Sequence, residues 1–75
     1  MLRIRLRIKE LAEEKKMSQS RLQREAGVTM PQLRRYWSNN TESVTLDALA
    51  RIARALGVGP LALMEEVQVS EDSEV

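Results

Sequence analysis

The stretch that decides the fold runs from residue 18 to residue 38 and reads SQSRLQREAGVTMPQLRRYWS. It contains two segments of about nine residues whose apolar side chains recur at helical spacing. Ser18 and Thr29 are favourable N-cap residues, and each follows an apolar residue that lies five positions before a leucine, the spacing of a hydrophobic staple. Gly27 stands where the first segment ends and suits the left-handed conformation of a helix C-terminus. The stretch therefore predicts two short helices joined by a tight turn.

The same signals extend to the rest of the chain. Thr45 follows Val44, five residues before a leucine, and Gly59 with Pro60 at the next position fits another helix start. Gly57 suits a helix end. We expect an all-α fold, a compact five-helix bundle, with helices at 6–16, 18–26, 29–38, 45–56 and 60–66.

The two ends of the chain follow a different pattern. Apolar residues alternate with Arg and Lys at the amino terminus, which predicts a short strand over 2–5, although one helix through this region is the alternative. Residues 67–69 could pair with that strand, and residues 71–75 are acidic and expected to be disordered. The expected domain therefore covers residues 1–66, followed by a tail over 67–75.

Composition excludes several classes of function. Seventy-five residues make one domain, and the chain has no Cys and no His. Disulfides, thiolate zinc sites and histidine-based acid–base chemistry are therefore excluded, and we expect no enzymatic activity, no cofactor and no metal. No apolar stretch is long enough to cross a membrane and no signal peptide is visible, so the expected location is the cytoplasm.

The charge is unevenly distributed along the chain. Residues 1–35 carry ten Lys and Arg against four acids, whereas residues 36–75 carry two Arg against seven acids. A basic first half suits a polyanion such as DNA, and an acidic second half suits water or a protein partner. The alternative is two ordinary solvated faces.

The pair of helices at 18–38 predicts a helix-turn-helix. Leu22, Ala26, Val28 and Leu33 are spaced to hold the two helices together at a steep angle, and the second helix can then enter a DNA major groove. A generic helical hairpin without a DNA-binding role is the alternative interpretation.

The sequence resembles the Cro/phage-repressor (XRE-like) helix-turn-helix family. The matching stretches are IKELAEEKKMSQ at 8–19, AGVT at 26–29 and TLDALARIARALGV at 45–58, and the resemblance covers about residues 5–66. It implies a lambda-repressor-like bundle and a transcriptional regulator, most often a repressor of bacterial, archaeal or phage origin associated with the nucleoid. It also implies sequence-specific binding of double-stranded DNA as a homodimer.

The resemblance also implies roles for individual residues. Helix 29–38 would read the major groove, with an Arg at the family's base-reading position one turn into the helix. The expected base-reading residues are Met30, Pro31, Gln32 and Arg35. The expected phosphate-contacting residues are Ser18, Gln19, Arg34, Ser38, Asn39 and Asn40. Leu33 and Trp37 are expected to face the core, with Tyr36 at their edge.

The sequence departs from the family at three places. The family often pairs an Arg in the first helix with a Glu late in the third, and here those positions are Ala12 and Trp37. The loop after the reading helix carries Glu42, which would repel phosphate. Met30 followed by Pro31 is an unusual start for a reading helix.

Two further interpretations remain open from the sequence. The chain could instead be a protein-interaction module, such as an antitoxin-type partner or an adaptor of the same fold, and the acidic second half motivates this reading. The residues that could form a dimer interface, or could equally close the monomer core, are Leu61, Leu63, Met64 and Val67.

Overall fold

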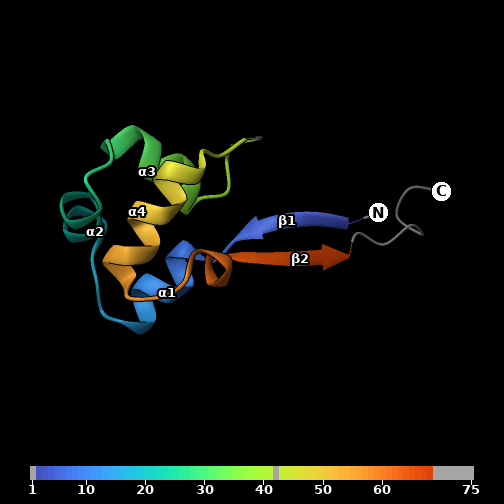
Figure 1. Ribbon diagram of the computed structural model, residues 1–75, viewed down its shortest axis with the longest axis horizontal. Helices are drawn as coiled ribbons and strands as arrows, with labels where there is room; N and C mark the ends of the chain where they lie inside the picture. Colours follow the sequence, from blue (N-terminus) through green and yellow to red (C-terminus); the bar gives the residue numbers. More distant parts are fainter. Residues whose placement is uncertain (1, 42, 69–75) are drawn as a thin grey trace.

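The computed structural model describes residues 2–41 and 43–68 (Figure 1). Over these residues the chain forms two strands, four α-helices and one 3-10 helix. In chain order they are β1 (Leu2–Leu6), α1 (Ile8–Glu14), α2 (Gln19–Ala26), α3 (Met30–Trp37), α4 (Leu46–Leu56), η1 (Pro60–Leu63) and β2 (Met64–Gln68). The expectations for residues 69–75 lie outside the described part of the chain.

The helices and the strands occupy different parts of the molecule. The four α-helices gather in one lobe, and β1 and β2 extend from it side by side as a hairpin-like arm (Figure 1). The strands pair antiparallel, with Leu2 opposite Gln68 and Leu6 opposite Met64. The chain therefore begins and ends its described part in the same small sheet.

The core lies between the helices. Its large, fully buried side chains come from α1, α2, α3, α4 and η1: Ile8, Leu22, Leu33, Ile52 and Leu63. None of the buried residues in the described part of the chain is polar or charged. Burial of a side chain of this size contributes about 1.5–3 kcal/mol each, so these contacts dominate the stability of the lobe.

The helix starts agree with the predicted caps. The hydroxyl of Ser18 accepts a hydrogen bond from the backbone N–H of Arg21 at 3.1 Å. Thr29 and Thr45 do the same for α3 and α4, at 3.3 and 3.1 Å. These side chains satisfy N–H groups that the first helical turn leaves without partners.

The five-helix prediction is wrong, because there are four α-helices in the described residues. Residues 60–66 do not form a helix throughout. The N–H of Ala62 donates to the carbonyl of Gly59 at 3.0 Å, a 3-10 turn that ends at Leu63, and β2 follows directly. Pairing with β1 supplies the backbone of this segment with partners that a further helical turn would otherwise provide.

The amino-terminal strand is confirmed, and it runs one residue further than predicted, to Leu6. The first helix consequently starts at Ile8 rather than at residue 6. Between them, the N–H of Arg7 donates to the carbonyl of Leu63 at 2.7 Å. This bond joins the start of α1 to the end of η1 and fixes the base of the two-stranded arm.

Candidate nucleic-acid interface

The turn between α2 and α3 is held by one left-handed glycine and one side-chain hydrogen bond. Gly27 has a φ of 72°, which glycine adopts at little cost. The side-chain amide of Gln23 donates to the carbonyl of Val28 at 2.6 Å. The sequence reasoning did not identify Gln23, because its partner is a backbone group whose direction depends on the geometry of the turn.

The two helices of the motif meet through the four predicted residues. Leu22, Ala26, Val28 and Leu33 are all buried. Leu33 has no exposed surface, so the side of α3 that carries it is fixed against the core. The opposite side of α3 is therefore the one that can meet a ligand.

The outer side of α3 is accessible. Pro31, Arg34, Arg35 and Ser38 are exposed, and Met30 and Gln32 are half-buried. At a helical repeat of 3.6 residues, positions 31, 34, 35 and 38 form one stripe along the helix. This stripe carries two guanidinium groups, which can donate paired hydrogen bonds to phosphate or to a guanine edge.

The inner side of α3 differs from the prediction at Tyr36 and Trp37. Tyr36 is buried, at 3% exposure, whereas Trp37 is half-buried and packs on the margin of the core. The phenol oxygen of Tyr36 accepts a hydrogen bond from the N–H of Thr45 at 3.1 Å. Tyr36 thus satisfies a backbone group beside the start of α4, a role that the sequence pattern alone did not reveal.

The predicted phosphate-contacting residues are distributed over three places. Ser18 and Gln19 lie at the amino-terminal end of α2, exposed and half-buried respectively. Arg34 and Ser38 lie on α3, where the hydroxyl of Ser38 donates to the carbonyl of Arg34 at 2.9 Å. Asn40 is exposed just beyond α3.

Asn39 has a structural role that the sequence did not predict. Its side-chain oxygen accepts from the N–H of Leu6 at 2.6 Å, and its side-chain nitrogen donates to the carbonyl of Leu6 at 3.0 Å. The residue has a φ of 60°, which Asn tolerates better than most residues. Its amide therefore connects the end of α3 to β1, and this use competes with the predicted contact to phosphate.

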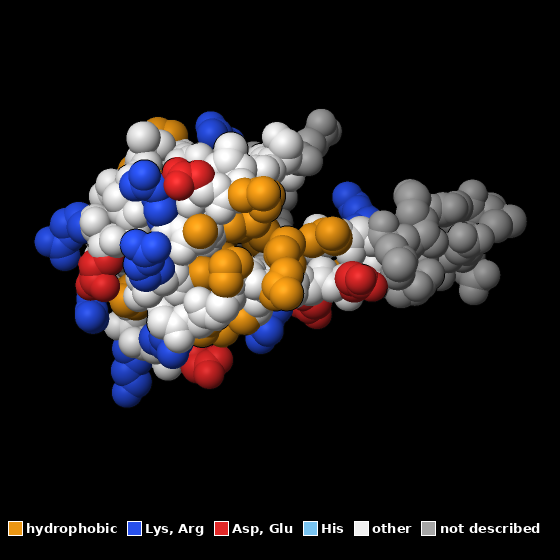
Figure 2. Space-filling model, in the orientation of Figure 1, with side chains coloured by type: hydrophobic (Ala, Val, Ile, Leu, Met, Phe, Trp, Pro, Cys, Tyr) orange, Lys and Arg blue, Asp and Glu red, His pale blue; other side chains and the backbone are white. Residues whose placement is uncertain are grey.

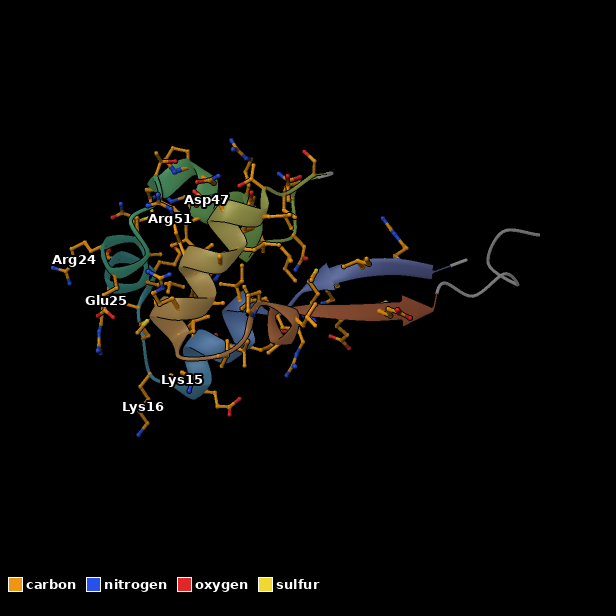
Figure 3. The ribbon with its side chains drawn as sticks, viewed as in Figure 1. Lys15, Lys16, Arg24, Glu25, Asp47 and Arg51 are labelled. Atoms are coloured by element: carbon orange, nitrogen blue, oxygen red, sulfur yellow. The ribbon has the colours of Figure 1, made fainter. Side chains whose placement is uncertain are left out.

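Other charged side chains surround the motif. Lys16 and Arg24 extend outward from the helical lobe, and Asp47 lies beside Arg51 on α4 (Figure 3). Nε of Arg51 is 2.9 Å from an oxygen of Asp47, and its guanidinium lies next to the turn at Gly27. Lys and Arg are spread around the lobe on the face drawn in Figure 2, and the apolar side chains gather where the lobe meets the arm.

Within residues 2–41 and 43–68, no group of three or more carboxylate, Cys or His side chains is placed to hold a metal ion. No helix in this part of the chain has the length and hydropathy needed to cross a membrane.

Two short helices joined by a tight turn and packed together through buried apolar residues, with an exposed cationic stripe on the second, are the arrangement of a helix-turn-helix protein. The family model for the Cro/C1-type helix-turn-helix DNA-binding domain matches residues 7–68. The chain belongs to this family of DNA-binding transcription regulators of the XRE type, which are typically not enzymes.

Solved structures similar to this chain include the following two. A protein from Bacteroides fragilis, described as a candidate DNA-binding protein, is 28% identical with a TM-score of 0.73, and the match covers 84% of this chain and 100% of that chain. A chain of the SinR protein/SinI protein complex is 28% identical to this chain with a TM-score of 0.71, and the match covers 75% of this chain. This chain spans about half of that matched chain, 54% of its length. No curated protein matches the sequence.

Proposed function

We propose that this protein is a sequence-specific regulator, most simply a repressor, that reads double-stranded DNA with the exposed stripe of α3. The observation that carries the proposal is the orientation of α3, because Leu33 is fully buried while Arg34 and Arg35 are exposed on the other side. A helix fixed in this way presents the same side chains to every DNA site it meets. Membership of a DNA-binding family supports the same conclusion.

Arg35 is the residue we assign to base reading. It lies one turn into α3 on the exposed stripe, where its guanidinium can donate to O6 and N7 of a guanine. Gln32 can pair with adenine, while Met30 and Pro31 offer apolar contact to a thymine methyl group. Met30 and Gln32 are half-buried, so their contribution is smaller than that of Arg35.

The phosphate contacts position α3 rather than select a sequence. The N-terminus of α2 supplies the side chain of Gln19 and the N–H groups of the first turn, which favour an anion. Arg34, Ser38 and Asn40 provide contacts at the end of α3. We assign Asn39 to the connection with β1 instead, because its amide is already paired with Leu6.

We further propose that the protein binds a pseudo-palindromic site as a homodimer in the cytoplasm. Two copies would then place their α3 helices one turn of DNA apart, about 34 Å. Of the residues considered for the interface, Leu63 closes the monomer core with no exposed surface, whereas Leu61 is 80% exposed. Leu61 is thus available to a partner and Leu63 is not.

Selection from a random duplex pool tests the proposal. Bound sequences should share a motif with inverted half-sites about ten base pairs apart, at least one guanine being invariant in each half. Affinity for the selected site should fall steeply with salt, because phosphate contacts release counterions. Light scattering of the free and bound protein measures the number of chains. Enrichment of no motif would contradict the proposal.

The alternative function is that of a protein-interaction module that kept the fold. One similar solved structure is a complex of two different proteins, SinR and SinI, and this observation favours the alternative. Equal binding to selected and random duplexes, with little dependence on salt, would favour it.

A further inference from the structure

The outer edge of β1 faces a groove. The groove has a volume of about 500 Å³ and lies between the two strands and the loop that follows α3. Asn39, Thr41, Ser43 and Val44 form its wall on the loop side. In Figure 2 a hollow separates this loop from the two-stranded arm.

The backbone of β1 shows which groups point into this groove. The N–H and the carbonyl of Leu6 both pair with the side chain of Asn39, on the side away from β2. In a strand, successive residues direct these groups to opposite sides. The N–H and carbonyl of Ile4 therefore point the same way as those of Leu6, into the groove. Among residues 2–41 and 43–68 nothing pairs with the Ile4 groups on that side.

The side chain of Asn39 makes the hydrogen bonds to Leu6 that a residue of a neighbouring strand would make. A side-chain amide presents a carbonyl oxygen and an N–H donor on one edge, as a single residue of an antiparallel strand presents its own C=O and N–H to its neighbour. Asn39 uses both against Leu6, at 2.6 and 3.0 Å. The pairing then stops, and the next equivalent position along β1, Ile4, is open. An extended peptide laid in the groove would continue the ladder that Asn39 begins.

The side chains of β1 indicate the chemistry of that peptide. On one face, Ile4 is 68% exposed, lines the groove together with the half-buried Met64, and lies opposite Glu66 of β2. Arg3 and Arg5 project from the other face. A guanidinium nitrogen of Arg5 lies 2.9 Å from a carboxylate oxygen of Glu65, the residue opposite it on β2. The strand already paired with β1 is therefore an acidic one. Arg5 already meets two carboxylates, Glu10 and Glu65. A second strand on the outer edge therefore gains from an acidic residue opposite Arg3 and an apolar residue opposite Ile4.

A second copy of this chain fits the edge less well. Antiparallel pairing of two β1 strands about Ile4 would place Arg3 of one copy opposite Arg5 of the other. Like charges directly opposite each other on a sheet are unfavourable. The cationic edge instead favours an anionic partner.

We propose that the outer edge of β1 binds an extended, acidic segment of a partner protein by β-augmentation, with alternating acidic and apolar residues. Main-chain hydrogen bonds to Ile4 would contribute affinity, and Arg3 and the exposed Ile4 side chain would select the sequence. This proposal is independent of DNA binding, because the edge belongs to the arm and not to α3. It also places the partner on the basic strand rather than on the acidic half of the chain.

Amide hydrogen exchange, measured by NMR on the full chain without DNA, tests the proposal. The probe is a capped peptide of alternating valine and glutamate, and the matched control peptide has lysine at each glutamate position. When half the protein is bound, exchange at the Ile4 amide should slow about twofold. The Arg5 amide, which faces β2, should not change. A control peptide N-methylated at alternate residues should give no protection.

The variant Arg3→Glu provides the reciprocal test, with circular dichroism to verify the fold. It should weaken binding of the glutamate peptide and strengthen binding of the lysine peptide. Unchanged Ile4 exchange with the glutamate peptide would overturn the proposal, leaving the arginines to keep an edge strand from aggregating. Ile4 protection that rises with protein concentration and needs no peptide would also overturn it, in favour of a second copy.

Discussion

The helix-turn-helix and the two-stranded arm are stabilised in different ways. The helices of the motif are stabilised by N-cap side chains, which bond backbone N–H groups three residues later in the chain. They are also stabilised by a core that excludes water, as at Leu22 and Leu33. The arm joins positions that are about sixty residues apart, as in the hydrogen bond from Arg5 to Glu65, and much of it is exposed. Local signals thus define the DNA-binding element, whereas the arm depends on the rest of the fold being in place.

The largest expected effect is in the core of the motif. Leu22→Ala removes a side chain with no exposed surface, so we expect the free energy of unfolding to fall by about 2–5 kcal/mol. Urea denaturation followed by circular dichroism measures the change. The matched control is Leu46→Ala, since Leu46 is 83% exposed and should lose less than about 0.5 kcal/mol. Equal losses at both positions would show that the helical core is not the main source of stability.

The connection between the two regions is tested at Asn39. Asn39→Gly keeps the positive φ but removes the amide, leaving the N–H and carbonyl of Leu6 without their partner. We expect a loss of about 1–3 kcal/mol, measured by urea denaturation, because both groups are partly buried. Asn40→Gly controls for the added flexibility of glycine. A similar loss in the two variants would mean that the amide contributes nothing.

The turn of the motif is tested at Gly27. Gly27→Ala places a Cβ at a φ of 72°, which should cost about 1–2 kcal/mol in thermal or urea unfolding. The Cβ would lie 3.4 Å from the guanidinium of Arg51, a side chain that can move. The control is Gly59→Ala, because Gly59 has an ordinary φ and open space around it. That variant should be unchanged or slightly more stable.

The smallest expected effect on stability is electrostatic and comes from the ion pair between Arg5 on β1 and Glu10 on α1. Burial is the largest single influence on Glu10 and opposes its charge, but the hydrogen bond from Arg5, a backbone hydrogen bond and the charges of Arg5 and Arg7 together outweigh it, so the pKa of Glu10 is lowered. The unfolded chain therefore takes up this proton at a higher pH than the folded one, so stability is lost as pH falls through and below the ordinary range of a glutamate. The effect is small, because Glu10 and Arg5 are 38% and 42% exposed.

Thermal unfolding of the protein and of Glu10→Gln between neutral and acidic pH isolates this contribution. The difference in stability between the two should shrink as the pH falls. A difference that stays constant over this interval would show that the ion pair with Arg5 does not contribute to the pH dependence.

The predictable part of the structure is the part that local chemistry determines. Thr29 and Gly27 have the same roles in any chain that places them at a helix start and a helix end, and both were identified from the sequence. The exposed stripe of α3 follows from helical spacing once Leu33 is placed inside. The residues of the candidate site could therefore be placed on the surface, although their contacts with DNA stay a prediction.

The remainder depends on partners that are distant in the chain. Local sequence predicts a helix at residues 64–66, because nothing nearby in the sequence reveals that β1 pairs with them. The pairing of the Asn39 amide with Leu6 could not be predicted, because Leu6 lies 33 residues earlier in the chain. The inner and outer positions of Tyr36 and Trp37 depend on the exact rotation of α3, which is fixed by the packing of the whole lobe.

The central claim is that Arg35 reads a base on DNA. The most direct measurement is competition binding of the protein and of Arg35→Ala to the selected duplex and to the same duplex with its invariant guanine replaced. The account predicts that the protein prefers the guanine by about 1–3 kcal/mol and that Arg35→Ala abolishes this preference. Gln19→Ala should weaken both duplexes equally and keep the preference. An Arg35→Ala variant that still distinguishes the two duplexes as well as the protein does would contradict the claim.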